Sequence, residues 1–334
     1  MKSTPPSAED SVQSLRFLLQ LIAISIATLV VSLSVVLYFM HSSPPAIDTQ
    51  AIDSSQWQQP SLATLGKSPH DSLILYGREL VVHTALYIGP KGKVKPLSNG
   101  MNCQNCHLEA GTKLYGNNYS MVAATYPKYR ERSGTIESVS KRVNDCIVRS
   151  LNGTAIDTSS HEMQALTAYI LWLGKDVKKG QKVAGAGIST LSYLPRAASA
   201  IEGKTIYAQK CQSCHGANGE GVLNTEKIEY EYPPIWGVHS YNIGAGLYRL
   251  SRIAGYVKSN MPFGTTYDKP ILSDAQAWDV AAYINAMPRP TMDIRHDWPR
   301  IAAKPIDHPY GPYSDTFSEM RHKYGPYIGM TLSK

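Results

Sequence analysis

The sequence has few cysteines, little charge and no sign of a nucleic-acid partner. Of its 334 residues five are cysteines and 18% are charged, with a formal net charge of +7. Four cysteines form two Cys-x-x-Cys pairs and Cys146 stands alone. Because Cys146 then has no partner, no intramolecular disulfide is expected for it. The positive charge suits an anionic partner only weakly. No run of Lys and Arg with interleaved aromatic residues suggests nucleic-acid binding.

Each cysteine pair is followed directly by a histidine. The two motifs consist of Cys103, Cys106 and His107, and of Cys211, Cys214 and His215. Cys-x-x-Cys-His is the attachment sequence of c-type haem, in which the thiols bind the haem vinyl groups and the histidine ligates the iron. A zinc half-site or a redox dithiol is the alternative for a bare cysteine pair. The histidine in both copies favours two covalently bound haem c groups.

Residues 17–40 contain no charged side chain. About 20 apolar residues cross a bilayer, whereas the hydrophobic region of a cleavable signal is about 7 to 15 residues long. We therefore expect an uncleaved transmembrane anchor, the alternative being a buried helix of a soluble domain. Lys2 and Arg16 precede the segment and the next basic residue is Lys67, which predicts a cytoplasmic amino terminus. The rest of the chain would lie in the periplasm, anchored to a bacterial inner membrane by a single pass.

The remaining sequence is an internal repeat. The amphipathic segment 72–89 precedes the first haem motif, and the amphipathic segment 201–215 ends with the second. Each half then has a second expected helix, over 160–174 and 273–287, with a serine and an acidic residue near its start. This order resembles the class I cytochrome c fold. We predict a mainly α protein with two tandem class I cytochrome c domains behind an N-terminal transmembrane helix. The predicted parts are a cytoplasmic N-terminus (1–16), an anchor (17–40), a linker (41–60), a first cytochrome domain (61–180), an interdomain linker (181–200), a second cytochrome domain (201–290) and a C-terminal tail that wraps over the domains (291–334).

The second domain offers a methionine as the distal haem ligand. Met261 is followed by proline, lies after the haem motif and precedes the closing helix, as the distal ligand does in class I cytochromes. A methionine in the core is the alternative. Lys258 is close to Met261 in sequence, but no sequence pattern supports Lys258 as a ligand of the haem iron. The predicted ligands of the second haem are therefore His215 and Met261.

The first domain has Cys146 where a methionine is expected. Ile136, Val139 and Val143 recur at helical spacing, which places Cys146 on the inward stripe of one predicted helix that ends at Asn152-Gly153. The neighbouring side chains on this helix are Arg142, Arg149 and Ser150. Cationic neighbours lower the pKa of a thiol and attract an anion. We predict His107 and Cys146 as the ligands of the first haem; a buried structural cysteine beside solvated arginines is the alternative.

Taken together, these motifs resemble those of the dihaem thiosulfate dehydrogenases, which form tetrathionate. The most specific segment is NDCIVRSLNG around Cys146, together with CQNCH; MPFGTTYD, LSDAQAWDVAAYIN and the closing KYGPYIG support it. The resemblance covers residues 61–334. The N-terminal anchor is a departure, since many relatives are soluble periplasmic proteins.

The resemblance implies that two thiosulfate ions are joined at a His/Cys-ligated haem and that the second haem passes the electrons to a c-type cytochrome or an oxidase. Since thiosulfate is a dianion, the site needs cations; Arg142 is the first candidate, followed by Arg132 and Arg149, with Ser150 nearby. We expect Cys146 to leave the iron transiently and to carry a thiosulfate adduct.

Three alternatives remain open at this stage. The chain would also suit a membrane-anchored dihaem electron carrier without substrate chemistry, although the lone Cys146 counts against it. It would suit a tetrathionate reductase that works in the reverse direction. The sulfur-oxidation cytochromes with a Cys-ligated haem are a neighbouring family.

Overall fold

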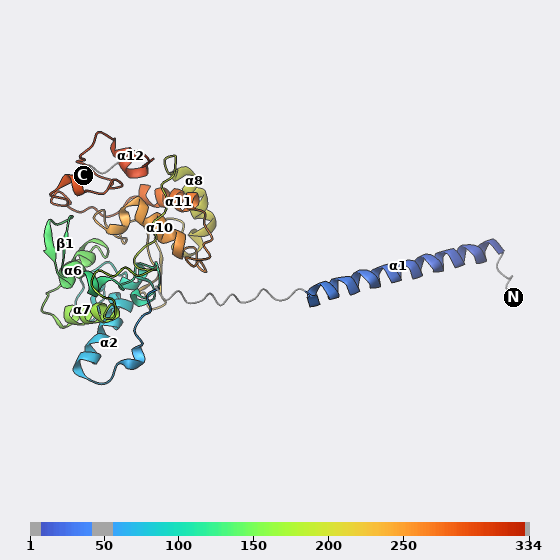
Figure 1. Cartoon of the computed structure of the whole chain (residues 1–334), viewed down its shortest axis with the longest axis horizontal. Coiled ribbons are helices and arrows are strands. Elements are labelled where there is room, and N and C mark those ends of the chain that lie inside the picture. The colour runs from blue at the N-terminus through green and yellow to red at the C-terminus, as the bar shows by residue number, and fades with distance from the viewer. Residues whose placement is uncertain (1–7, 42–55, 331–334) are drawn as a thin grey trace. The chain divides into compact units, whose positions relative to one another are not determined.

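The computed structural model describes residues 8–41 and 56–330 and divides the chain into two units, residues 1–53 and 54–334 (Figure 1). Residues 1–7 of the predicted cytoplasmic end, 42–55 of the predicted linker and 331–334 of the predicted tail lie outside the described residues. The second unit is mainly helical and contains only short strands.

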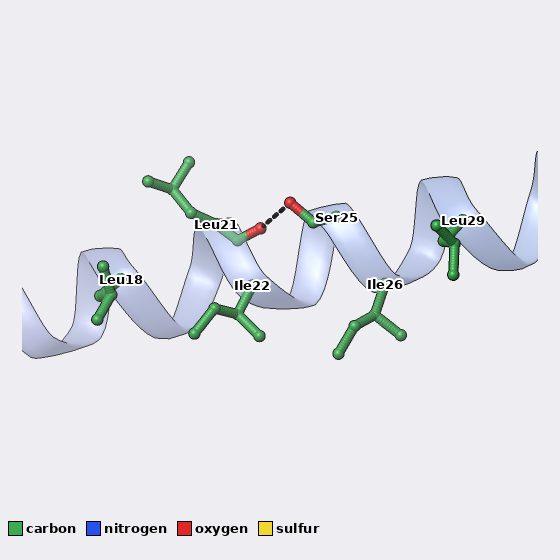
Figure 2. A pocket seen from close by; sticks show the side chains of 6 residues that line it. All are labelled: Leu18, Leu21, Ile22, Ser25, Ile26 and Leu29. Atoms are coloured by element: carbon green, nitrogen blue, oxygen red, sulfur yellow. Dashed lines mark hydrogen bonds between the residues drawn. The ribbon is translucent and has the colours of Figure 1, made fainter.

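The first unit contains one long apolar helix, α1 (Ala8–His41). Its segment Arg16–Ser34 has a mean hydropathy of 2.3 and none of it is buried against protein. The hydroxyl of Ser25 donates to the carbonyl of Leu21 at 2.9 Å (Figure 2), so this polar group needs no other partner among the apolar side chains. By length and composition α1 fits a membrane anchor, and it equally fits an N-terminal signal sequence.

Each cytochrome domain is built on a pair of helices that cross closely. In the first domain α2 (Pro69–Val82) packs on α7 (His161–Leu173), and in the second α8 (Ala200–Lys210) packs on α11 (Asp274–Ala286). A β-carbon at Gly77 of α2 would overlap the backbone carbonyl of Ala165, and one at Gly203 of α8 would overlap that of Asp279. Glycine is therefore what lets both helix pairs approach so closely.

The predicted closing helices are confirmed with their caps. The hydroxyl of Ser160 accepts a hydrogen bond from the backbone N–H of Met163 at the start of α7. Ser273 accepts one from Gln276 at the start of α11, and the Gln276 side chain accepts the Ser273 N–H in return, which completes a capping box.

The remaining helices and strands are short. The first predicted helix of the repeat is broken at His83, where α2 ends and α3 (Thr84–Ile88) begins. The other elements are α4 (Leu108–Gly111), α5 (Val122–Thr125), α6 (Val139–Arg149), α9 (Gln212–His215), α10 (Leu250–Asn260), α12 (Glu319–Tyr324), the antiparallel pairs β1 (Lys128–Arg130) with β2 (Thr135–Glu137) and β3 (Val222–Leu223) with β4 (Tyr230–Tyr232), and the 3-10 turns η1 (Leu62–Thr64), η2 (Cys103–Asn105), η3 (Gly246–Tyr248) and η4 (Ile301–Ala303).

The helix around Cys146 begins later than its apolar spacing predicts. Ile136 lies in β2, opposite Tyr129 of β1, and is 74% exposed, so its assignment to the inward stripe was wrong. Helix α6 starts after Ser138, whose hydroxyl caps the backbone N–H of Lys141. Val139, on the first turn, is buried. The last turn of α6 contacts the second domain, because Asn242 binds the carbonyls of Val148 and Arg149.

The segment after α11 contacts both cytochrome domains. The backbone N–H of Trp298 donates to the carbonyl of Arg132 at 2.7 Å, and Asp297 pairs with Arg149 of α6. Further along, Asp307 pairs with Arg249, the residue before α10. These contacts give each domain one aspartate partner from residues 291–330.

Candidate functional site

A cavity of about 370 Å³ in the first cytochrome domain brings Cys146 to the first haem motif. Cys103, Cys106 and His107 approach from the turn that follows α3, and Cys146 approaches from the middle of α6. Two segments that are separated in sequence by four short elements, α4, α5, β1 and β2, therefore face the same space. The four residues lie where a haem attached at the two thiols would be enclosed.

The surroundings of His107 suit an iron ligand. Its Nδ1 lies 2.5 Å from the carbonyl of Asn117, which leaves Nε2 with a lone pair for a metal. The ring stacks on Tyr119 with centroids 4.4 Å apart. Burial lowers the pKa of His107 to about 4, so the ring is neutral, as metal binding requires. Together with the two thiols, this arrangement fits a c-type haem.

The motif histidine of the second domain is held in the same way. His215 Nδ1 lies 2.8 Å from the carbonyl of Pro233, and burial lowers its pKa. Met261 follows the last residue of α10 and packs, half-buried, against the core of the second domain. Phe263, two residues further on, is 91% exposed.

Helix α6 places Arg142 one turn before Cys146, and both line the cavity. The negative charge of the Cys146 thiolate raises the pKa of Arg142, against the smaller opposing effect of burial. The guanidinium of Arg142 therefore lies close enough to Cys146 to respond to a negative charge on its sulfur. Ser150 closes the last turn of the helix and also lines the cavity.

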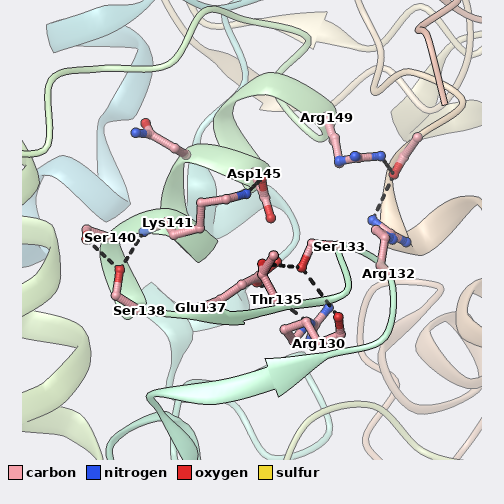
Figure 3. A network of polar contacts seen from close by, with 12 residues as sticks. Arg130, Arg132, Ser133, Thr135, Glu137, Ser138, Ser140, Lys141, Asp145 and Arg149 are labelled. Atoms are coloured by element: carbon pink, nitrogen blue, oxygen red, sulfur yellow. Dashed lines mark hydrogen bonds and ion pairs between the residues drawn. The ribbon is translucent and has the colours of Figure 1, made fainter. Parts of the chain in front are cut away.

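Arg132 and Arg149 differ in their relation to the cavity. Arg132, from the loop between β1 and β2, lines it, and its Nε lies 4.0 Å from Asp297. Arg149 is not among the lining residues; both of its terminal nitrogens donate to Asp297 at 2.7 Å. In Figure 3 the two arginines come from different elements and point toward the same place. The structure therefore gives Arg149 a structural partner, while a role in substrate binding stays a prediction.

The cavity has further cationic walls that the sequence did not indicate. Arg130 of β1 lies on the same side as Arg132, and Arg249 and Arg252 come from the second domain. The aromatic side chain of Trp298, after α11, also lines the cavity. Since none of these residues lies near a haem motif in sequence, only the tertiary fold reveals them.

Comparisons with protein families agree with two cytochrome domains. Residues 93–178 match the family model described as "SoxA/TsdA, cytochrome c domain", and residues 200–288 match the model described as "Cytochrome c". Each match contains one of the two haem attachment motifs. Two c-type haems follow from these domains and their cysteine pairs.

Two similar proteins from bacteria are named thiosulfate dehydrogenase. The protein from Stutzerimonas stutzeri is 36% identical over 236 residues, which cover 71% of this chain and 74% of that protein. The protein from Psychrobacter arcticus is 38% identical over 204 residues, which cover 61% of each. A solved structure, thiosulfate dehydrogenase (TsdBA) from Marichromatium purpuratum in its as-isolated form, is 31% identical with a TM-score of 0.63. The match covers 70% of this chain but only half of that longer one.

Proposed function

We infer the function from the family, because this chain belongs to the thiosulfate dehydrogenase family of dihaem cytochromes c. We propose that it joins two thiosulfate ions to tetrathionate and releases two electrons to an external acceptor. The observation that supports this function best is the position of Cys146. Its side chain lines a cavity together with a haem attachment motif and with Arg142, whose pKa a negative charge on the Cys146 sulfur raises. A simple electron carrier has no need of a thiolate and a cation at a cavity beside its haem.

The two haems supply the electron acceptors, one electron each. In the first domain Cys103 and Cys106 would attach the haem, and His107 and Cys146 would ligate its iron. In the second domain Cys211 and Cys214 would attach the haem, and His215 and Met261 would be its ligands. The acceptor beyond the second haem is a c-type cytochrome or an oxidase.

The chain's own residues provide a two-step sulfur exchange. In the first step the Cys146 thiolate forms an S–S bond with the outer sulfur of one thiosulfate, and two electrons leave. In the second step the outer sulfur of another thiosulfate attacks the sulfur that Cys146 carries. This attack forms the central S–S bond of tetrathionate and returns Cys146 as a thiolate leaving group. No proton is transferred in either step.

The arginines of the cavity lower the repulsion between the reactants. Two unit charges of the same sign repel each other by about 4 kcal/mol at about 4 Å under the dielectric of a protein surface. For two dianions the product of the charges, and with it the repulsion, is about four times larger. Arg142, beside Cys146, stabilises the anion that is bonded to the sulfur. Arg132, across the cavity wall, offers a second cation, and the Ser150 hydroxyl offers a neutral donor.

The test of this function is the reaction itself. Oxidised full-length protein with both haems attached is mixed with thiosulfate, while haem reduction and tetrathionate are followed together, for wild type and Cys146→Ala. We expect fast reduction with tetrathionate formed by wild type and neither by the variant, whose haems are still reduced by dithionite. A Cys146→Ala protein with full turnover would contradict the mechanism. A wild-type protein that exchanges electrons with cytochromes but ignores thiosulfate would be an electron carrier.

Helix α1 anchors these domains to the bacterial inner membrane, with the haems in the periplasm. Support comes from the uncharged run of residues 17–40, from the mean hydropathy of 2.3 over Arg16–Ser34, and from the basic residues Lys2 and Arg16 before the run. Membrane fractions washed with alkaline carbonate should retain the protein, and its amino-terminal peptide should be recovered intact by mass spectrometry. A mature protein that begins after residue 40 would show that α1 is a signal sequence instead.

A further inference from the structure

We infer that Arg252 of the second cytochrome domain binds the sulfur anion in the cavity of the first domain, an inference that rests on the proposed function. Part of the wall of the cavity that Cys146 lines consists of Leu247, Arg249 and Arg252; Leu247 belongs to η3, Arg252 to α10, and Arg249 lies between these two elements. The second domain would then have two tasks: electron transfer through its own haem and recognition of the substrate at its neighbour's.

Helix α10 is fixed against the first domain, so Arg252 has a defined place. The hydroxyl of Tyr256 donates to the carbonyl of Asn105, inside the first haem motif, at 3.3 Å. One turn further on, the side-chain amide of Asn260 donates to the carbonyl of Tyr115 at 3.1 Å. Two hydrogen bonds from successive turns therefore attach α10 to the segments that carry and follow the motif.

Most cavity arginines already have a carboxylate. Arg130 lies 3.7 Å from Glu137, and Arg132 lies 4.0 Å from Asp297. Arg249 is held by Asp307 through two of its nitrogens. Arg130 and Arg249 therefore contribute little net charge to the cavity, because each faces its own anion. Arg132 shares Asp297 with Arg149, so these three residues together keep one positive charge.

Arg142 and Arg252 are different. Neither has a carboxylate within ion-pair distance among residues 8–41 and 56–330. One comes from each cytochrome domain, and the Cys146 thiolate is available to balance only the first. Arg252 is exposed, whereas Arg142 and Cys146 are half-buried, so Arg252 is the more accessible of the two arginines to an anion from solvent.

The electrostatic setting of Arg252 also calls for an anion. Burial and the neighbouring cation Arg249 lower the pKa of Arg252, Asp307 raises it, and Arg130 lowers it further. The guanidinium therefore stands among cations from both domains without a carboxylate of its own. A guanidinium binds an oxyanion through two parallel N–H groups, which suits the sulfonate end of thiosulfate or tetrathionate. This contact leaves the outer sulfur free to point toward Cys146.

Arg252 has two candidate anionic partners, the sulfur anion and the carboxylates of the first haem, and the experiment distinguishes between them. Arg252→Gln and Arg252→Lys are compared with wild type in the full-length protein with both haems attached. Arg295→Gln is the control, since Arg295 is 83% exposed, pairs with Asp293 and is not a lining residue. The measurements are KM and kcat for thiosulfate, the binding of tetrathionate to the oxidised protein by calorimetry, and the midpoint potentials of both haems.

For Arg252→Gln we expect KM for thiosulfate and Kd for tetrathionate to rise about tenfold or more, as for the loss of a charge-assisted hydrogen bond. The value of kcat should change less than about threefold. Arg252→Lys should restore part of the affinity, both midpoint potentials should stay unchanged, and Arg295→Gln should match wild type.

Two results would overturn the inference. One is equal tetrathionate affinity and equal KM in wild type and Arg252→Gln. The other is a shifted midpoint potential of the first haem with affinity unchanged, which would assign Arg252 to the haem carboxylates. A wild-type protein inert to thiosulfate would instead overturn the proposed function, and the calorimetric comparison does not depend on turnover.

Discussion

The two cytochrome domains have the same scaffold and different distal sides. In both, a glycine lets the first helix cross the closing helix, and a backbone carbonyl orients the motif histidine. In the first domain, however, Cys146 and Arg142 lie one turn apart on a helix and line the same cavity as His107. The second domain has Met261 at the end of a helix, followed by a fully exposed Phe263. We propose that this difference, on a shared scaffold, separates a site for sulfur chemistry from a site for electron transfer.

The strongest test of this difference is to give the first domain the ligand of the second. Cys146→Met keeps a sulfur in place but removes the thiolate that can form and break an S–S bond. We expect thiosulfate turnover to fall about a thousandfold or more, because the loss of a nucleophile costs at least that much. The measurement is steady-state tetrathionate formation at matched haem content.

The control for Cys146→Met is the reduction of both haems by dithionite, which should remain complete. Turnover within tenfold of wild type would mean that the thiolate is not the group that carries sulfur.

The shared part of the comparison is tested by the two crossing glycines. Gly77→Ala and Gly203→Ala each place a β-carbon into a backbone carbonyl, which the helices relieve only by moving apart. We expect each change to lower the free energy of unfolding by about 3 kcal/mol, from overpacking. Chemical denaturation of the holo-protein measures it.

Gly246→Ala is the matched control for these two glycines, since a β-carbon there meets no atom within 4 Å. Its effect on the free energy of unfolding should stay within about 0.5 kcal/mol. A large loss for only one of the two crossing glycines would show that the domains are less alike than their backbones suggest.

The cation beside Cys146 gives the next effect. Arg142→Gln removes the guanidinium that faces the thiolate, so KM for thiosulfate should rise by a factor of about ten to a hundred. Arg149→Gln, on the same helix, should leave KM nearly unchanged, because Arg149 binds Asp297 instead of lining the cavity. Initial rates over a range of thiosulfate concentrations separate the two. If Arg149→Gln raised KM as much as Arg142→Gln, the prediction that only Arg142 of these two binds the substrate would be wrong.

The smallest expected effect concerns acid stability. Arg249 and hydrogen bonds from Ser251 hold the pKa of Asp307 below its ordinary value, although burial alone would raise it. A lowered folded-state pKa means that Asp307 stabilises the fold above pH of about 4 and that this contribution is lost as pH falls through the folded pKa. Asp307→Asn should therefore lower the free energy of unfolding at neutral pH by about 1 to 3 kcal/mol. Below pH of about 3 the free energies of unfolding of the variant and of wild type should become more similar. Denaturation curves across this range measure the effect, and a constant difference at all pH values would contradict it.

Sequence patterns gave the scaffold because its signals are local. The haem motifs, and the serine caps of α7 and α11, lie within a few residues of the elements that they define. The spacing of Ile136 to Val139 fits a helix and so gave a wrong prediction. The competing signal is the cap at Ser138, after which the helix begins at Val139, three residues beyond Ile136. Here the capping residue outweighed periodicity.

The cavity walls could not be predicted, because they depend on contacts over long distances in sequence. Arg149 lies three residues from Cys146 and looked like its neighbour, yet Asp297 draws it away from the cavity. Arg252 lies in the other domain, and nothing in its local sequence marks it as facing Cys146. Such residues become visible only when the two domains and the segment after them are packed together.

The place of Trp298 has a consequence for how the protein matures. Its side chain lines the cavity, and its backbone N–H donates a hydrogen bond to the carbonyl of Arg132. In the sequence, Trp298 comes after both haem motifs. Domains fold in the order in which they emerge during synthesis, so both haem motifs become available for attachment before this wall of the cavity exists. A chain that ended before Trp298 would keep both haem motifs but would lack this wall of the cavity. Haem content alone is therefore a poor measure of how many molecules in a preparation are competent.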